Sequence, residues 1–118
     1  MPDLFTVVEG LFNLPVRLAE ATWYLHVIVR HPEMAEHLGN VKQALAGPHV
    51  VLQSEHTRDS YLYHLRLASP PRLYVRVVVR FRRNAQDELQ EGVVRTAFLT
   101  DTMSGGSAVW ITRHLPIR

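Results

Sequence analysis

The sequence predicts an α+β domain, in which one or two N-terminal helices pack on a four-stranded antiparallel sheet and short strands precede the helices. Two observations carry this prediction. Residues 19–46 show apolar side chains at helical spacing, whereas residues 50–112 contain short runs rich in β-branched and aromatic residues. Helices followed by strands are typical of α+β folds, with the helices on one sheet face and the other face free for function.

Length and composition limit the classes of protein that fit. We expect a single domain over residues 1–118, and the 47% of hydrophobic residues can form a packed core. No apolar run is long enough to span a bilayer, so no membrane partner is expected. The chain has no cysteine, which excludes disulfides and thiolate metal sites. Met1-Pro2-Asp3 does not look like the start of a signal peptide, so we expect a cytoplasmic protein.

Two short extended segments come first, at Phe5–Val8 and Leu14–Leu18. A helix over Ala19–Arg30 follows, and Pro32 limits it because the residue before a proline is kept out of the α region. Most of this helix is apolar, so we expect it to be largely buried, with one narrow polar stripe. One side is formed by Ala21, Leu25, Ile28 and Val29, and the other by Thr22, Trp23, His26 and Arg30.

A second helix begins at Pro32, where a missing N–H costs nothing, and ends at Gly47-Pro48. Its apolar stripe consists of Met34, Leu38, Val41 and Leu45. Strands are then expected at Val50–Gln53, Ser60–Leu67, Arg72–Arg83 and Gly92–Asp101, with a polar connection over residues 84–92. Residues 108–112 form either one more short strand or a docked tail.

The basic residues are concentrated in the second half of the chain. Residues 1–59 carry four basic and seven acidic groups, whereas residues 60–118 carry nine basic and four acidic groups. Nearly all the basic residues are arginines, whose planar guanidinium binds phosphate with two parallel hydrogen bonds. The basic half is therefore a candidate phosphate-binding surface. An arginine-rich solvated surface without a ligand is the alternative.

The strand over Arg72–Arg83 places alternate residues on opposite faces, and its odd positions from Leu73 to Phe81 are apolar and face the core. Its even positions include Arg76, Arg80 and Arg82, which form a ladder suited to a polyanion. The next strand adds Thr96 and Thr100, whose hydroxyls can donate to phosphate oxygens. Tyr63 lies on a neighbouring strand, where a tyrosine can stack on an unpaired base. Ordinary β-propensity on a solvent face is the alternative for all of them.

Seven histidines occur in the chain, and three of them lie near the predicted helices. His26, His31 and His37 are five and six residues apart, which is not the spacing that places two imidazoles on one helical face, so no metal site is expected. His26 is either a core histidine satisfied by a hydrogen bond or an acid–base group near Arg30. His31 precedes Pro32 at a helix start, where backbone N–H groups favour an anion.

Several segments carry a resemblance when they are taken together. They are Arg17-Leu18, Trp23–Ile28, Arg30–Met34, Gly47-Pro48, Tyr61-x-Tyr63, the valine strand ending at Arg80, Gly92–Phe98, and Trp110 after a glycine turn. This combination resembles small phage and bacterial proteins grouped with the barnase–EndoU–colicin–RelE (BECR) superfamily of ribonucleases. The resemblance covers about residues 14–110, and it implies one or two helices against a four-stranded antiparallel sheet.

The resemblance also implies a function. It predicts a toxin-like or phage-associated, metal-independent endoribonuclease without a cofactor, in which the RNA 2′-hydroxyl attacks the adjacent phosphodiester. Transfer RNA is one candidate target, and an antitoxin or immunity protein is a candidate partner. The predicted catalytic residues are His26, His31, Arg66, Arg80 and Thr96, and the predicted substrate-binding residues are Arg30, Arg76, Arg82, Tyr63 and Thr100.

Two alternatives remain open at this point. One is a non-catalytic module of the same fold that binds RNA or a protein, and the other is a domain whose histidines are purely structural. Geometry discriminates between them. A ribonuclease requires His26 or His31 to open onto the same cleft as at least one of Arg66, Arg80 and Thr96.

Overall fold

Seven strands form one mixed, mostly antiparallel sheet in the computed structural model, which describes residues 2–112. Their order across the sheet is β1-β2-β6-β5-β4-β3-β7, and the β2–β6 pair is parallel. The predicted α+β class is confirmed. The strands are β1 (Asp3–Val8), β2 (Pro15–Ala19), β3 (Val50–Ser54), β4 (Ser60–Arg66), β5 (Tyr74–Arg83), β6 (Leu89–Thr100) and β7 (Gly106–Ile111).

The predicted number of four strands in the sheet is wrong. The expected antiparallel meander is present as β3–β6, but the sheet continues on both sides. On one side β2 pairs with β6 at Gly92 and Val93, and β1 pairs with β2. On the other side β7 pairs with β3, because residues 101–105 carry the chain from β6 across the sheet to the opposite edge. The β2–β6 and β3–β7 pairings join segments far apart in sequence, which local periodicity does not report.

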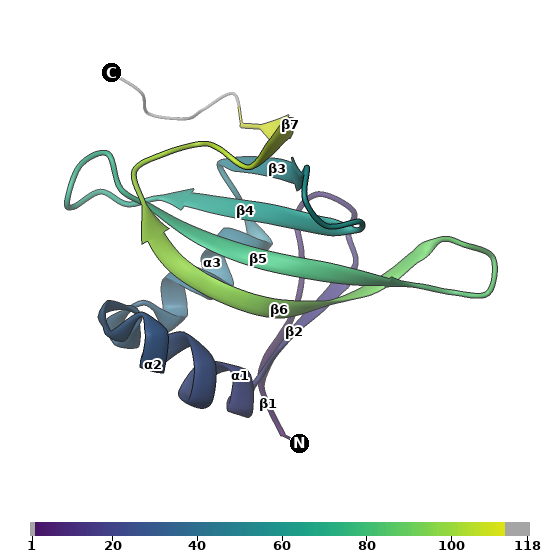
Figure 1. Ribbon diagram of the computed structural model, residues 1–118, viewed down its shortest axis with the longest axis horizontal. Helices are drawn as coiled ribbons and strands as arrows, with labels where there is room; N and C mark the ends of the chain where they lie inside the picture. Colours follow the sequence, from purple (N-terminus) through teal and green to yellow (C-terminus); the bar gives the residue numbers. More distant parts are fainter. Residues whose placement is uncertain (1, 113–118) are drawn as a thin grey trace.

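The helices gather on one side of the sheet, while the β5–β6 hairpin projects away from them (Figure 1). The first helical stretch consists of α1 (Glu20–Thr22), a π-helical turn η1 (Trp23–Val27) and α2 (Ile28–Arg30). The second consists of a 3₁₀ turn η2 (Pro32–Glu36) and α3 (Leu38–Ala46). The predicted breaks at Pro32 and Gly47 are confirmed. No helix within residues 2–112 is long and apolar enough to cross a membrane.

The predicted faces of the first helix are wrong. Trp23 and Val27 are buried, whereas Leu25 is 74% exposed and Val29 is 67% exposed. The helix contacts the sheet along β6 and therefore buries only one side. The large indole of Trp23 takes that side, because an aromatic ring removes more apolar area from water than the aliphatic side chains of Leu25 and Val29.

The main core lies between the helices and the sheet. Met34, Val41 and Leu45 of the predicted stripe are buried, and Leu38 packs against them. The odd positions of β5 face this core as predicted, with Val75, Val77, Val79 and Phe81 buried. The β4 register pairs Tyr63 with Val77, so the tyrosine faces the same core. Core packing thus sets which residues remain on the opposite, open face.

The sheet face opposite the helices, which we call the open face, is covered in its middle by a chain segment and is exposed elsewhere. Gly105 lies against Leu62, so the crossing over residues 101–105 covers the middle of this face. A second apolar cluster of Val50, Leu52, Leu62 and Val78 lies on this side. The even positions of β5 beyond this cluster, Arg80 and Arg82, remain exposed. The exposed part therefore lies at the hairpin end of β5 and β6.

Candidate anion-binding surface

An open depression of about 500 Å³ lies at the hairpin end of the sheet. Five arginines and two aspartates dominate its lining, which gives the lining a net charge of +3. We call it the arginine depression. It is lined by Arg58, Asp59, Arg80, Phe81, Arg82, Arg83, Asp87, Val93 and Arg95.

Strand register brings the arginines to this place. Arg80 and Arg82 occupy successive even positions of β5, so their side chains point to the open face about 7 Å apart. In the register of β6, Val93 lies opposite Arg80 and Glu91 lies opposite Arg82. Arg82 forms an ion pair with Glu91, with 3.3 Å between Nε and Oε1.

A β-bulge brings a further arginine from β6. Val78 pairs with Thr96 while Val79 pairs with Val94, so Arg95 is the extra residue between two ladder positions. A bulge changes the direction in which the local side chain points, and such bulges recur next to functional sites. Arg95 is exposed and lines the depression together with Arg80.

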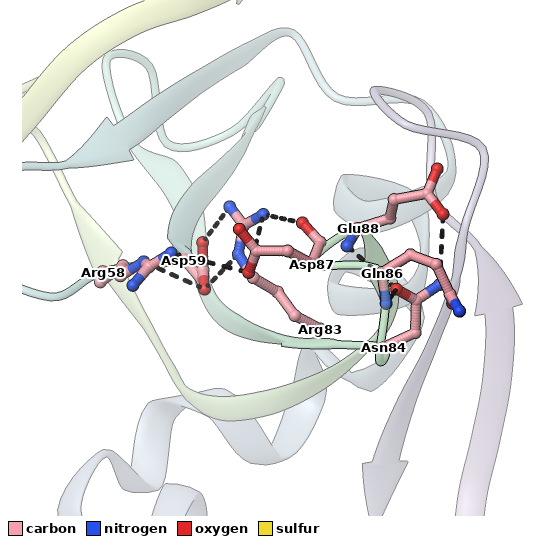
Figure 2. A network of polar contacts seen from close by, with 7 residues as sticks. All are labelled: Arg58, Asp59, Arg83, Asn84, Gln86, Asp87 and Glu88. Atoms are coloured by element: carbon pink, nitrogen blue, oxygen red, sulfur yellow. Dashed lines mark hydrogen bonds and ion pairs between the residues drawn. The ribbon is translucent and has the colours of Figure 1, made fainter.

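Ion pairs and hydrogen bonds hold one wall of the depression (Figure 2). The guanidinium of Arg83 donates from Nε and Nη2 to the two carboxylate oxygens of Asp59, at 2.9 and 2.8 Å. Arg58 lies within 3.9 Å of both Asp59 and Asp87. The hydrogen bond from Arg83 holds the pKa of Asp59 below its usual range. This network joins the β3–β4 loop to the β5–β6 hairpin.

The hairpin has its own polar turn. The side-chain oxygen of Asn84 accepts hydrogen bonds from the backbone N–H of Gln86 at 2.9 Å and of Glu88 at 3.0 Å (Figure 2). Asp87 adopts a φ of 62°, in the left-handed region that asparagine and aspartate tolerate better than most residues. The turn is shorter than predicted, because β6 begins at Leu89 rather than Gly92.

The five arginines of the depression differ in whether they form an ion pair with an acidic residue. Within residues 2–112, Arg58, Arg82 and Arg83 form ion pairs, whereas Arg80 and Arg95 form neither an ion pair nor a side-chain hydrogen bond. Two guanidinium groups without an acidic partner in one concave, positively charged site favour the binding of an anion.

Only part of the predicted site is assembled here. Of the predicted residues, Arg80 and Arg82 line the depression, and Thr96 lies half-buried on the same face, next to the bulge. No histidine within the described residues lines it. The arrangement therefore supplies cations for a phosphate but no imidazole for proton transfer at the same point.

Two predicted substrate-binding residues are buried, which corrects their assignment. Tyr63 is fully buried, and its hydroxyl donates to the carboxylate of Glu9 at 2.8 Å. Burial and the Glu9 carboxylate raise the pKa of Tyr63. Arg76 is buried against His64 and donates to the carbonyls of Thr102 and Ser104. Neither side chain is available to stack on a base or to bind a phosphate.

The two predicted catalytic histidines lie elsewhere. His26 is half-buried in η1. The ring of His31 packs on Phe98, with 5.2 Å between ring centroids, and its Nδ1 lies 3.9 Å from the carboxylate of Glu33. Phe98 pairs with Arg76, four positions along β5 from Arg80, which corresponds to about 13 Å. The histidines and the unpaired arginines therefore do not share a cleft.

The remaining predicted residues are also separate from the depression. Arg66 lies at the end of β4, beside a different depression formed with Leu67, Ala68 and Pro71. The hydroxyl of Thr100 contacts Thr102 at 3.2 Å. Arg30 is exposed at the end of α2. The structure thus distributes the predicted catalytic set over several places on the molecule.

Sequence reasoning missed Arg58, Arg83 and Arg95 as members of a site. Arg83 ends the predicted strand at an odd position, whereas the phosphate-binding ladder was predicted from the even positions alone. Arg95 stands between Val94 and Thr96, and no local signal marks a bulge there. Asp59 and Asp87 were the sequence signal that could have indicated the site, since an aspartate near several arginines is typical of an ion-pair network.

Comparison with known proteins adds no assignment: no family model, no curated protein and no solved structure matches this chain. The resemblance to BECR ribonucleases therefore stays a prediction from the sequence. Within residues 2–112, no group of three or more histidine, aspartate or glutamate side chains is arranged to hold a metal ion.

Proposed function

We propose that this chain is an RNA-binding module that contacts phosphate groups at the arginine depression. The observation that carries the proposal is the gathering of five arginines against two aspartates in one concave site, where two of the arginines form no ion pair within residues 2–112. Arginine binds phosphate oxygens through charge-assisted hydrogen bonds. The choice of RNA among polyanions comes from the sequence resemblance stated above.

Binding without cleavage is the simpler function for this geometry. Cleavage by 2′-hydroxyl attack needs a base and an acid within hydrogen-bond reach of the reacting oxygens, while cations stabilise the phosphorane. The depression offers the cations, and His26 and His31 lie outside its lining. Endoribonuclease activity therefore becomes an outcome that the binding experiment also tests.

The experiment measures the fluorescence anisotropy of a labelled single-stranded oligouridylate against the full chain at increasing salt. We expect log K to fall linearly with log salt, with a slope of about −0.7 for each phosphate contacted. Arg80→Gln should weaken binding. Arg72→Gln removes the same charge from an exposed arginine outside the depression and serves as the matched control. Salt-independent binding, or equal effects of both variants, would overturn the proposal.

The same samples decide between binding and cleavage. We expect the RNA to remain intact after long incubation in EDTA. RNA ending in 2′,3′-cyclic phosphate would replace the proposal by the metal-independent endoribonuclease. In that case His26→Ala and His31→Ala, assayed beside thermal melting, would show which imidazole acts as acid or base, because a catalytic histidine contributes about 10²–10⁴-fold in rate.

A further inference from the structure

The bulge in β6 places one specific pair of arginines next to each other. Arg80 lies directly opposite Val93, so Arg95 is its diagonal neighbour across the two strands. Diagonal neighbours in an antiparallel pair lie about 7–8 Å apart, with a somewhat shorter distance between their Cβ atoms, and long side chains can bridge this separation. Both residues line the arginine depression. Two guanidinium groups at this separation can therefore converge on a single small anion.

The other three arginines of the depression are already paired with acidic residues. Arg83 donates two hydrogen bonds to Asp59, and Arg82 forms an ion pair with Glu91. Arg58 faces Asp59 and Asp87. An anion that binds to these three must compete with a carboxylate at ion-pair distance. Within residues 2–112 no carboxylate lies at ion-pair distance from Arg80 or Arg95, and the charge of Arg80 is the smallest of the causes that lower the pKa of Asp59. The acidic residues of the protein thus pair with three arginines of the depression and leave Arg80 and Arg95 without an ion pair within residues 2–112.

We propose that Arg80 and Arg95 together form a seat for one phosphate group, and that the β6 bulge is the feature which builds it. The proposal rests on the proposed function and deepens it, since it names the two residues and the ligand group, a single phosphodiester phosphate of the RNA strand. Arg58 and Arg83 form the wall beside the seat, with Asp59 as their positioning residue. Arg82 contributes to the field around the seat but does not contact this phosphate.

A shared phosphate makes a specific prediction for the double variant. If two arginines hold one phosphate, removing both eliminates one contact with the RNA backbone. If they hold separate phosphates, removing both eliminates two. The salt slope counts these contacts, because each neutralised phosphate of a single strand contributes about 0.7 to it. Counting contacts distinguishes a seat from a general positive charge.

The experiment is a double-mutant cycle on the full chain, with Arg80→Gln, Arg95→Gln and the combined variant titrated against the labelled oligouridylate. We expect each single variant to lose roughly tenfold in affinity, from the strength of charge-assisted hydrogen bonds. The combined variant should lose clearly less than the product of the two, and its slope should fall by about 0.7. Multiplicative losses with a slope change of about 1.4 would overturn the shared seat.

Two controls separate position from net charge. Arg95→Gln/Gln53→Arg restores the charge on an exposed residue of β3 that lies outside the lining of the depression. We expect it to bind as weakly as Arg95→Gln, and recovery of wild-type affinity would overturn the seat. Arg82→Gln should weaken binding clearly less than Arg80→Gln or Arg95→Gln does, because Arg82 contributes only to the field around the seat, and an equal loss would overturn the seat. Thermal melting of each variant verifies that the fold is retained, which we expect because both seat residues are exposed.

Failure of the seat and failure of the proposed function give different results. If the wild-type chain does not bind the oligouridylate at low salt, the proposed function fails and the seat fails with it. If the wild type binds with a steep salt dependence but Arg95→Gln behaves like Arg72→Gln, RNA binding stands and the seat is wrong.

Discussion

Nε of Arg76 donates a hydrogen bond to Nε2 of His64 over 2.7 Å, and both side chains are buried on the sheet face opposite the helices. Nδ1 of the imidazole lies 3.2 Å from the Val50 carbonyl, so these two partners assign a neutral ring with its proton on Nδ1. Nη2 of Arg76 also donates to the carbonyls of Thr102 and Ser104. The pair therefore ties the β6–β7 crossing to the sheet.

The first prediction concerns pH. Burial, followed by the charge of Arg76, lowers the pKa of His64 from 6.5 to about 4. Between these two values the unfolded chain binds more protons than the folded chain, so the stability that neutral His64 contributes is lost as pH falls. We expect the free energy of unfolding to drop by about 2 kcal/mol from this residue between about pH 7 and pH 5.

Urea denaturation of the wild type and of His64→Gln at both pH values measures this contribution. The variant cannot titrate at position 64 and should lose about 2 kcal/mol less than the wild type over the same interval. His49, whose pKa is also lowered by burial, is common to both chains and cancels in the comparison. Equal losses in the two proteins would show that His64 does not carry the pH dependence.

The second prediction separates a structural arginine from a binding one. Arg76→Met removes the hydrogen bonds to Thr102 and Ser104 and leaves Nε2 of buried His64 without a donor. We expect a loss of about 2–4 kcal/mol in the free energy of unfolding. RNA affinity should change no more than in Arg72→Gln. A stable Arg76→Met protein with much weaker RNA binding would instead restore Arg76 as a substrate contact.

The third prediction concerns buried Glu9. Its carboxylate accepts backbone hydrogen bonds from Leu11, Phe12 and Leu14 and one from the Tyr63 hydroxyl, which together hold the β1–β2 turn. Glu9→Gln replaces one accepting oxygen by an NH₂ group that faces donors. We expect it to cost about 2–4 kcal/mol, more than Tyr63→Phe, which removes a single hydrogen bond to a charged group worth about 1.5–3 kcal/mol.

Thermal or chemical unfolding of both variants tests this order, with the double variant closing the cycle. The two changes should be coupled, because the Tyr63 hydroxyl loses its charged acceptor in Glu9→Gln. A Glu9→Gln protein as stable as the wild type would mean that the carboxylate does not organise the turn.

The fourth prediction tests the orientation of the first helix. Trp23→Ala should cost about 3–5 kcal/mol, because the indole is buried against the sheet. Leu25→Ala should change the free energy of unfolding by no more than about 0.5 kcal/mol, because the leucine is on the solvent side. Chemical denaturation of both variants measures these values, and the reverse order would place Leu25 in the core.

Local sequence patterns correctly predicted those features that depend on residues close together in the chain. The alternation over β5 predicted which residues face the core, because a strand has a period of two and one of its faces is buried by the helices. Pro32 and Gly47 marked helix ends because their backbone chemistry acts on the chain next to them. Arg80 and Arg82 followed from the same alternation and do line the depression.

Other features depended on partners far along the chain. The packing of the first helix against β6 decided that Trp23, and not Leu25, enters the core. Arg76 has the same strand parity as Arg80 but is covered by the crossing, so its exposure was decided by residues 101–105. Tyr63 was predicted to stack on a base, whereas its pairing with Val77 of β5 places it on the side of β4 that meets the helices.

The amino-acid sequence by itself determined the α+β class, the central meander, the apolar face of β5 and the concentration of arginines in the second half. The tertiary structure alone decided the seven-strand order, the burial of Arg76 and the presence of both Arg80 and Arg95 in the lining of one depression. The physical reason is the separation along the chain over which each interaction acts. Backbone propensity and side-chain period act over a few residues, whereas strand register, bulges and coverage arise from contacts between segments that the chain brings together only on folding.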